Sequence, residues 1–208
     1  MKQQNEATIA TVPTLSLMER APVRFDVEEI WRPVGAAQLS SGLTRLLAVA
    51  QRGIASAQNC LGEAYGTGTG VKRDDRAALV WIRKAGEQGH APAQNNLGFI
   101  YAQGRGVAQD ELQAMNWFRR AAEQGHADAL YNLGTLHANG RGGVRQDVVL
   151  AYVLFSLAAT ANNAAAVQRR YLQPRLGSEQ FAEAQAMLRA WKLHTALPTR
   201  SKTGLLVH

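Results

Sequence analysis

The sequence has a single cysteine, Cys60, among its 208 residues, so no disulfide can form within the chain. One cysteine also excludes a zinc site built from cysteines alone and fits a reducing compartment. No stretch approaches the roughly 20 apolar residues that span a bilayer, and residues 1–20 lack the apolar core of a secretory signal. We therefore expect a cytoplasmic protein without a membrane span.

Charged side chains are also scarce, at 19% of the chain, whereas hydrophobic residues make up 46%. This balance excludes a disordered polar chain, and about 200 residues are enough to bury a sizeable core. The formal net charge is +7, and residues 165–208 contribute seven basic but only two acidic side chains. A basic C-terminal region admits an acidic partner without requiring one. Arginine outnumbers lysine, which is typical of a GC-rich bacterial genome.

The main positive feature of the sequence is an internal repeat with a period of 36 residues. Residues 55–90 and 91–126 align without a gap, and more than half of the aligned positions are identical. A third copy, residues 127–163, keeps the pattern after one extra residue in the loop at Gly142 and Gly143. A period of this length indicates structural units that stack on one another.

Each copy is predicted to form two helices joined by a tight turn. In the first helix of copy one, Leu61, Gly62 and Tyr65 share one arc at helical spacing and should face the core. Gly68 then ends this helix, and Asp74 is placed to cap the second helix. One such hairpin cannot bury its own apolar face. The sequence therefore predicts an all-α fold, a right-handed α-solenoid of about three helix-turn-helix repeats.

The regions that flank the repeats are predicted to cap the array. Residues 36–54 should form an N-terminal capping helix or half-repeat, and residues 164–195 should form C-terminal capping helices. Residues 1–35 show no periodicity, so we expect a mostly irregular segment there, and residues 196–208 are expected to form a flexible tail.

The repeat motif resembles that of a known family. Its Leu-Gly-x-x-Tyr-x-x-Gly-x-Gly-Val pattern, followed by Asp, Ala, Trp and Ala at fixed spacing, is similar to Sel1-like repeats, relatives of the tetratricopeptide repeat. Copies one and two fit fully, whereas copy three has His137 for Tyr, Leu154 for Trp and Asn162 for the closing Gly. The resemblance covers about residues 55–163. It implies adaptor roles in bacterial regulation, secretion or envelope processes.

Residues that suggest chemistry in other folds have structural explanations in this sequence. His90 and His126 occupy equivalent loop positions, which favours a role at a turn or helix end over metal ligation. The recurrent Gly-x-Gly follows a helix and lacks Gly-Lys-Ser/Thr, so it does not match a phosphate-binding loop. We therefore expect no catalytic residue, no cofactor and no metal, and hence no enzyme.

The predicted function is that of a non-catalytic scaffold that binds another protein or peptide in its concave groove. The first helix of each repeat usually lines this side of a solenoid. Phe99 and Tyr131 are candidate apolar anchors, and asparagine side chains can hold a peptide backbone. Packing of Phe99 against a neighbouring helix is an equally weighted alternative. The candidate binding residues, two in each copy, are Asn59, Glu63, Asn95, Phe99, Tyr131 and Thr135.

An alternative interpretation places the function on the basic C-terminal helices, which would bind nucleic acid or an anionic surface. No aromatic residues interleave with these charges in a recognisable module, which argues against a nucleic-acid partner. The candidate residues for this alternative are Arg169, Arg170, Arg175, Arg189 and Lys192.

Overall fold

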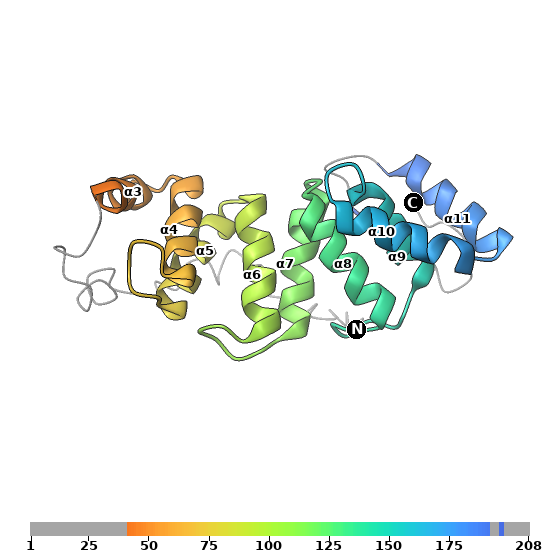
Figure 1. Cartoon of the computed structure of the whole chain (residues 1–208), viewed down its shortest axis with the longest axis horizontal. Helices are drawn as coiled ribbons and strands as arrows, with labels where there is room; N and C mark the ends of the chain where they lie inside the picture. The colour runs from red at the N-terminus through yellow and green to blue at the C-terminus, as the bar shows by residue number, and fades with distance from the viewer. Residues whose placement is uncertain (1–40, 192–195, 198–208) are drawn as a thin grey trace, which may run out of the picture. The chain divides into compact units, whose positions relative to one another are not determined.

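The computed structural model describes residues 41–191 and 196–197, and the regular structure in this part of the chain is helical. Nine α-helices and one short 3-10 helix follow one another within it, with no strand among them (Figure 1). The expected all-α fold is confirmed. In chain order the helices are α3 (Ser41–Gln51), α4 (Ala55–Thr67), α5 (Asp75–Glu87), α6 (Ala91–Gln103), α7 (Glu111–Glu123), α8 (Ala127–Asn139), α9 (Val148–Ala158), α10 (Asn163–Leu172), η2 (Gln173–Arg175) and α11 (Ser178–Ala190).

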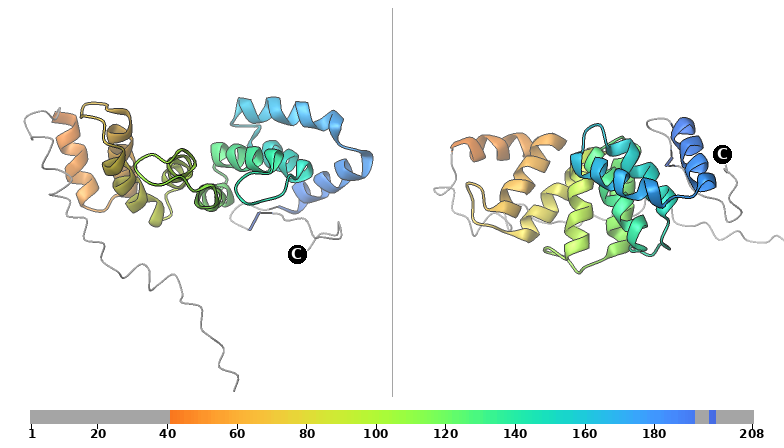
Figure 2. Two further views of the ribbon diagram at one scale, coloured as in Figure 1. Left: turned by 90° about the horizontal axis from the view of Figure 1, so that it is seen from below. Right: turned by 45° about the vertical axis from the view of Figure 1, so that its right-hand side comes forward.

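The helices α4 with α5, α6 with α7, and α8 with α9 form three consecutive pairs that match the three predicted repeats. The two helices of a pair pack closely, and the second helix of one pair packs against the first helix of the next. Figures 1 and 2 show this succession of hairpins from three directions. The repeats therefore stack as a solenoid, as the periodicity predicts.

Additional helices contact both sides of the three repeats. Helix α3 packs against α4, and both α10 and α11 pack against α9. These helices lie where capping helices were expected, while the exact boundaries of the caps stay predictions. The segments expected to be irregular or flexible, residues 1–35 and most of 196–208, lie outside the described residues, as do residues 36–40 and 192–195.

The ends of the helices follow the predicted capping pattern. Gly68 adopts φ 79° after α4, a left-handed conformation that favours glycine, and its N–H donates to the carbonyl of Ala64. The carboxylate of Asp74 accepts hydrogen bonds from the N–H groups of Arg76 and Ala77 at the start of α5. Equivalent aspartates cap α7 and α9 in the same way. Each repeat thus sets its own helix boundaries through local residues.

Two histidines begin the first helices of the second and third repeats. The Nδ1 atoms of His90 and His126 accept hydrogen bonds from the N–H groups of Ala93 and Ala129, at 3.4 and 3.3 Å. The predicted role of these histidines at a helix end is confirmed. An imidazole in this role must keep its Nδ1 unprotonated, because a protonated nitrogen cannot accept a hydrogen bond.

The two helices of each repeat approach each other most closely at a glycine of the first helix. A Cβ atom at Gly98 would overlap the ring of Phe118, and one at Gly134 would lie 2.8 Å from Cε1 of Phe155. Glycine inside a helix costs about 1 kcal/mol relative to alanine. The close contact explains why this cost recurs in every copy.

Replacing Gly98 with alanine should therefore lower the free energy of unfolding by about 1–3 kcal/mol, because Phe118 must move to admit the methyl group. The matched control is Gly66→Ala in α4. There a Cβ atom would meet its nearest neighbours at 3.5 Å, an ordinary contact, and helix propensity should add up to about 1 kcal/mol of stability. Urea unfolding of both variants measures the difference, and equal effects would contradict the close-approach explanation.

Stability should also decrease as the pH falls below about 6.5, the ordinary pKa of histidine in an unfolded chain. Burial lowers the pKa of both His126 and His137 in the folded state. The unfolded chain then binds more protons, so the stability present above pH 6.5 is lost as the pH falls toward the lowered values. Urea unfolding at about pH 7.5 and 5.5 measures this loss of stability. In the variant His126→Asn, the asparagine can cap the helix but does not titrate in this pH range. If the double variant His126→Asn/His137→Tyr lost as much stability between these pH values as the wild type, the two histidines would not be the cause.

Candidate functional site

The predicted binding residues lie on the first helices α4, α6 and α8, but they differ in exposure. Glu63 is exposed and Phe99 is 41% exposed, as expected for a binding surface. Asn59 and Asn95 are instead buried, at 5% and 6% exposure, which differs from the expectation of an exposed arc. An arc that is exposed on an isolated helix is covered in the stack, because the first helix of the next repeat contacts these two positions. The third-repeat residues Tyr131 and Thr135 are half-buried.

The buried asparagines join neighbouring first helices by hydrogen bonds. Asn96 Nδ2 donates to Asn59 Oδ1 at 3.0 Å and to Glu63 Oε1 at 2.8 Å. One repeat later, Asn132 Nδ2 donates to Asn95 Oδ1 at 3.0 Å. The same pair of motif positions therefore connects repeat one to two and repeat two to three. These amide oxygens therefore accept hydrogen bonds from the next repeat and hold neighbouring repeats together.

A cavity of about 380 Å³ opens between the first and second repeats, beside Phe99. Its apolar side includes Ile82 and Ile100, and its polar side includes Glu63 and Asn96. The ring of Phe99 also meets the ring of Phe118 edge-on, with centroids 5.4 Å apart. Phe99 therefore has features of both a packing residue and an exposed anchor. Its ring packs on a neighbouring helix, while a large part of the same ring stays accessible.

An arginine on the edge of this cavity was missed in the sequence. Arg105 Nη2 donates to the carbonyl of Gly66 at 2.6 Å and to Asp75 Oδ1 at 2.7 Å. Hydrogen bonds from Arg73 and then Arg105 hold the pKa of Asp75 below its usual range. The pairing fixes the loop of repeat two on the start of α5 in repeat one.

The signal for this pairing was present in the repeat alignment. Arg141 occupies the position of Arg105 in the third copy, and it pairs with Glu111, the equivalent of Asp75. The backbone N–H of Gly142 also donates to Glu111 Oε2 at 3.1 Å. A basic loop residue thus faces an acidic residue of the preceding copy, a relation that appears only when successive copies are compared.

The third-repeat candidates do not line the cavity beside Phe99. The ring of Tyr131 packs against Phe155, with centroids 5.7 Å apart. Thr135 Oγ1 donates to the carbonyl of Tyr131 at 3.0 Å. The six predicted residues therefore follow one series of first helices, and the structure brings Glu63 and Phe99 together at one cavity.

The basic residues of the C-terminal helices differ in how they present their charge. Arg170 and Arg189 are exposed, whereas Arg169 is half-buried. The guanidinium of Arg175 stacks 3.5 Å from the ring centroid of Tyr171. Lys192, the remaining candidate, lies outside the described residues. Binding of an anionic surface here stays a prediction.

Two further observations concern metals and membranes. Among residues 41–191 and 196–197, no three histidine, cysteine or acidic side chains gather in a way that could hold a metal ion. Within the same residues, every helix is too short or too polar to cross a bilayer.

Comparison with known proteins places the repeats in a family. The model of the Sel1 repeat matches residues 55–90, 91–126 and 127–163. No curated protein matches the chain. The chain is similar to a Sel1 repeat protein of Oxalobacter formigenes in its crystal structure, with 35% identity, a TM-score of 0.57 and coverage of 61% of this chain and 52% of that one.

A second similar structure is c5321, a protective antigen of uropathogenic Escherichia coli strains with an SLR fold. It is 35% identical, with a TM-score of 0.66 and coverage of 71% of this chain and 32% of that one. The chain therefore spans about half the length of the first protein and about a third of the second.

The hydrogen bonds of Asn96 should contribute measurably to stability. Asn96→Ala leaves the buried Asn59 Oδ1 without its donor from the next repeat, which costs about 1–3 kcal/mol. Cys60 occupies the same motif position in the first copy and is exposed, so Cys60→Ala is the matched control, with a change within about 0.5 kcal/mol. Urea unfolding compares the two variants. An unchanged free energy of unfolding in Asn96→Ala would show that the asparagine hydrogen bonds between repeats do not stabilise the stack.

Proposed function

The chain belongs to the Sel1 repeat family, and from this premise we propose that it is a non-catalytic scaffold that binds an extended segment of another protein along its first helices. The observation that carries the proposal is Phe99, a large aromatic side chain that is 41% exposed beside a cavity of about 380 Å³. Exposed aromatic residues next to a cavity are typical anchors of protein interfaces.

The cavity supports binding of an apolar side chain from the partner. Its apolar surface comes from Phe99, Ile82 and Ile100. The ring of Phe118 packs edge-on against Phe99 and fixes its orientation. The anchor is therefore already oriented before a partner arrives, so little side-chain entropy is lost on binding.

Glu63 gives the cavity a charge preference. Its Oε1 accepts hydrogen bonds from Asn59 and Asn96, and it forms no ion pair within the described residues. A carboxylate held in place in this way favours a lysine or arginine of the partner next to the apolar anchor. Asn59 and Asn95 then act by fixing the helices that carry the contact residues.

The third repeat extends the proposed surface. Thr135 follows Glu63 and Phe99 at the equivalent position of α8, whereas Tyr131 follows Asn59 and Asn95, and both are half-buried. An extended segment that enters at Phe99 would continue past these residues. A cytoplasmic location and an adaptor role belong to this proposal, as does the absence of catalysis.

Phe99→Ala should weaken capture of the partner by roughly thirtyfold, the effect of losing an interface residue worth about 2 kcal/mol. The matched control is Leu112→Ala, which removes another exposed apolar side chain, 55% exposed, from α7. Affinity purification with the full chain, followed by quantitative mass spectrometry, identifies the proteins lost with Phe99 and retained in the control. Circular dichroism confirms that helical content is unchanged.

Two results would contradict the proposal that the partner binds beside Phe99. Equal capture by the wild type and by Phe99→Ala would remove the anchor from the proposal. Capture that falls steeply with salt and depends on Arg170 and Arg189 would favour the alternative on the C-terminal helices. Glu63→Gln separates the charge preference from the anchor, because it should weaken only partners with a basic residue beside the apolar one.

A further inference from the structure

The third repeat contains a cavity of about 310 Å³ at the two positions where it departs from the motif. In the second repeat these positions hold Tyr101 and Trp117, and Arg83 Nη2 donates to the Tyr101 hydroxyl at 2.7 Å. The third repeat has His137 and Leu154 there instead. Both replacements are smaller, so volume filled by side chains in one copy is open in the next.

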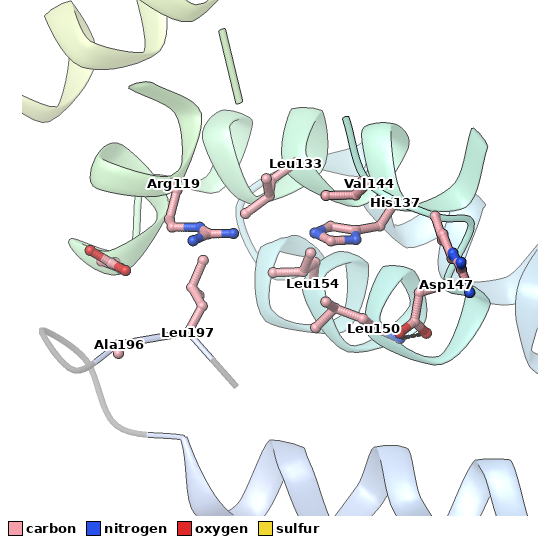
Figure 3. Close-up of a pocket in the computed structure, with 11 residues that line it drawn as sticks. Arg119, Leu133, His137, Val144, Asp147, Leu150, Leu154, Ala196 and Leu197 are labelled. Atoms are coloured by element: carbon pink, nitrogen blue, oxygen red, sulfur yellow. Dashed lines mark hydrogen bonds between the residues drawn. The ribbon is translucent and has the colours of Figure 1, made fainter. Parts of the chain in front are cut away.

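The smaller side chains leave two polar groups without their expected partners. His137 is only 7% exposed, and its Nδ1 has no hydrogen-bond partner among the residues that the structure describes. Arg119 is the equivalent of Arg83; its side chain is exposed at the edge of the cavity, and it forms no hydrogen bond or ion pair within the same part of the chain. Figure 3 shows the guanidinium of Arg119 and the ring of His137 pointing toward each other across the cavity.

The rest of the cavity is mainly apolar. Leu133, Leu150 and Leu154 line it, and Leu197 lies against it from the C-terminal side (Figure 3). A buried imidazole with an unused nitrogen, a guanidinium at the open edge and an apolar wall together resemble a small-molecule site, where few polar groups orient a largely apolar ligand.

We propose that this cavity binds a monocarboxylate with a compact apolar body. Its carboxylate lies between Arg119 and His137, and its apolar part contacts Leu133, Leu150 and Leu154. The proposal is independent of the groove beside Phe99.

The charges around the cavity determine the class of ligand. Arg119 and Arg145 are basic, whereas Glu123 and Asp147 are acidic and disfavour a second negative charge. Asp147 already accepts hydrogen bonds from the first turn of α9, so its carboxylate serves the helix. A single carboxylate therefore matches the site better than a phosphate or a dicarboxylate.

The protonation state of His137 fits this assignment. Burial lowers the pKa of His137, and Arg119 lowers it further while Asp147 opposes the shift. The ring is then neutral near pH 7, and in the tautomer with a proton on Nδ1 it donates one hydrogen bond to a carboxylate oxygen. Arg119 then attracts the carboxylate by its charge, and the hydrogen bond from His137 orients it.

Titration of the full chain with 3-phenylpropionate, followed by calorimetry and heteronuclear NMR, tests the site. We expect saturable binding with a dissociation constant of about 1 mM or tighter, with shifts centred on His137 and Leu154. The neutral control, 3-phenylpropanamide, should bind at least about tenfold more weakly, and Arg119→Gln should remove this preference. Equal binding of acid and amide to the wild type, or no saturable binding, would overturn the proposal.

A second variant tests the cavity itself. Leu154→Trp restores the residue of the second repeat, so it should abolish binding of the probe while the melting temperature stays equal or rises, because the open volume is filled. Arg83→Gln is the matched control, since it removes the equivalent arginine one repeat earlier and should leave binding unchanged. Retained binding in folded Leu154→Trp would place the probe elsewhere and refute the site. Should Leu154→Trp fail to fold, Arg119→Gln on the helix surface decides the question alone.

Discussion

The close approach of the two helices in each repeat, made possible by a glycine in the first helix, is the contact on which the other features depend. At Gly98 this contact is made with Phe118. The same Phe118 ring supports Phe99 edge-on, at the next residue along α6. One aromatic side chain therefore closes the hairpin and also orients the exposed anchor. A change that separated the two helices would displace the candidate binding surface together with the core, because both rest on the same ring.

Stacking of the repeats depends on a second layer of contacts, which are polar and join equivalent positions of successive copies. Gln94 Nε2 donates to the carbonyl of Gly86 at 3.1 Å, so a buried amide satisfies the end of the preceding helix. The pairs of Arg105 and Arg141 with the acidic residues of the preceding copy add charged contacts. The terminal copies each lack one member of the charged pair: Thr69 stands in the arginine position of the first copy, and a valine stands in the acidic position of the third. The sequence of each copy thus reflects whether a neighbouring copy exists on that side.

This dependence on neighbours explains what could be predicted from the sequence. Helix pairs, aspartate caps and the histidines at helix starts depend on residues close in the chain, so periodicity and capping rules found them. The exposure of Phe99 and Glu63 also followed from one helix considered alone. The burial of Asn59 and Asn95 did not, because it arises from contacts with residues 37 positions further along the chain, Asn96 and Asn132. The cavity beside Phe99 likewise exists only between two repeats.

The departures of the third copy show how a repeat protein can create a site without changing its fold. The third repeat packs on one side against the helices α10 and α11 instead of a further copy. His137 and Leu154 border Arg119 of the preceding repeat at a partly open cavity, and the second copy has larger rings at the two equivalent positions. Leaving this volume open forgoes packing energy and leaves a buried imidazole nitrogen without a bond. The second copy shows that the same backbone accommodates the larger pair, so the scaffold does not demand the open space. The cost is explained if the space is occupied in the working protein.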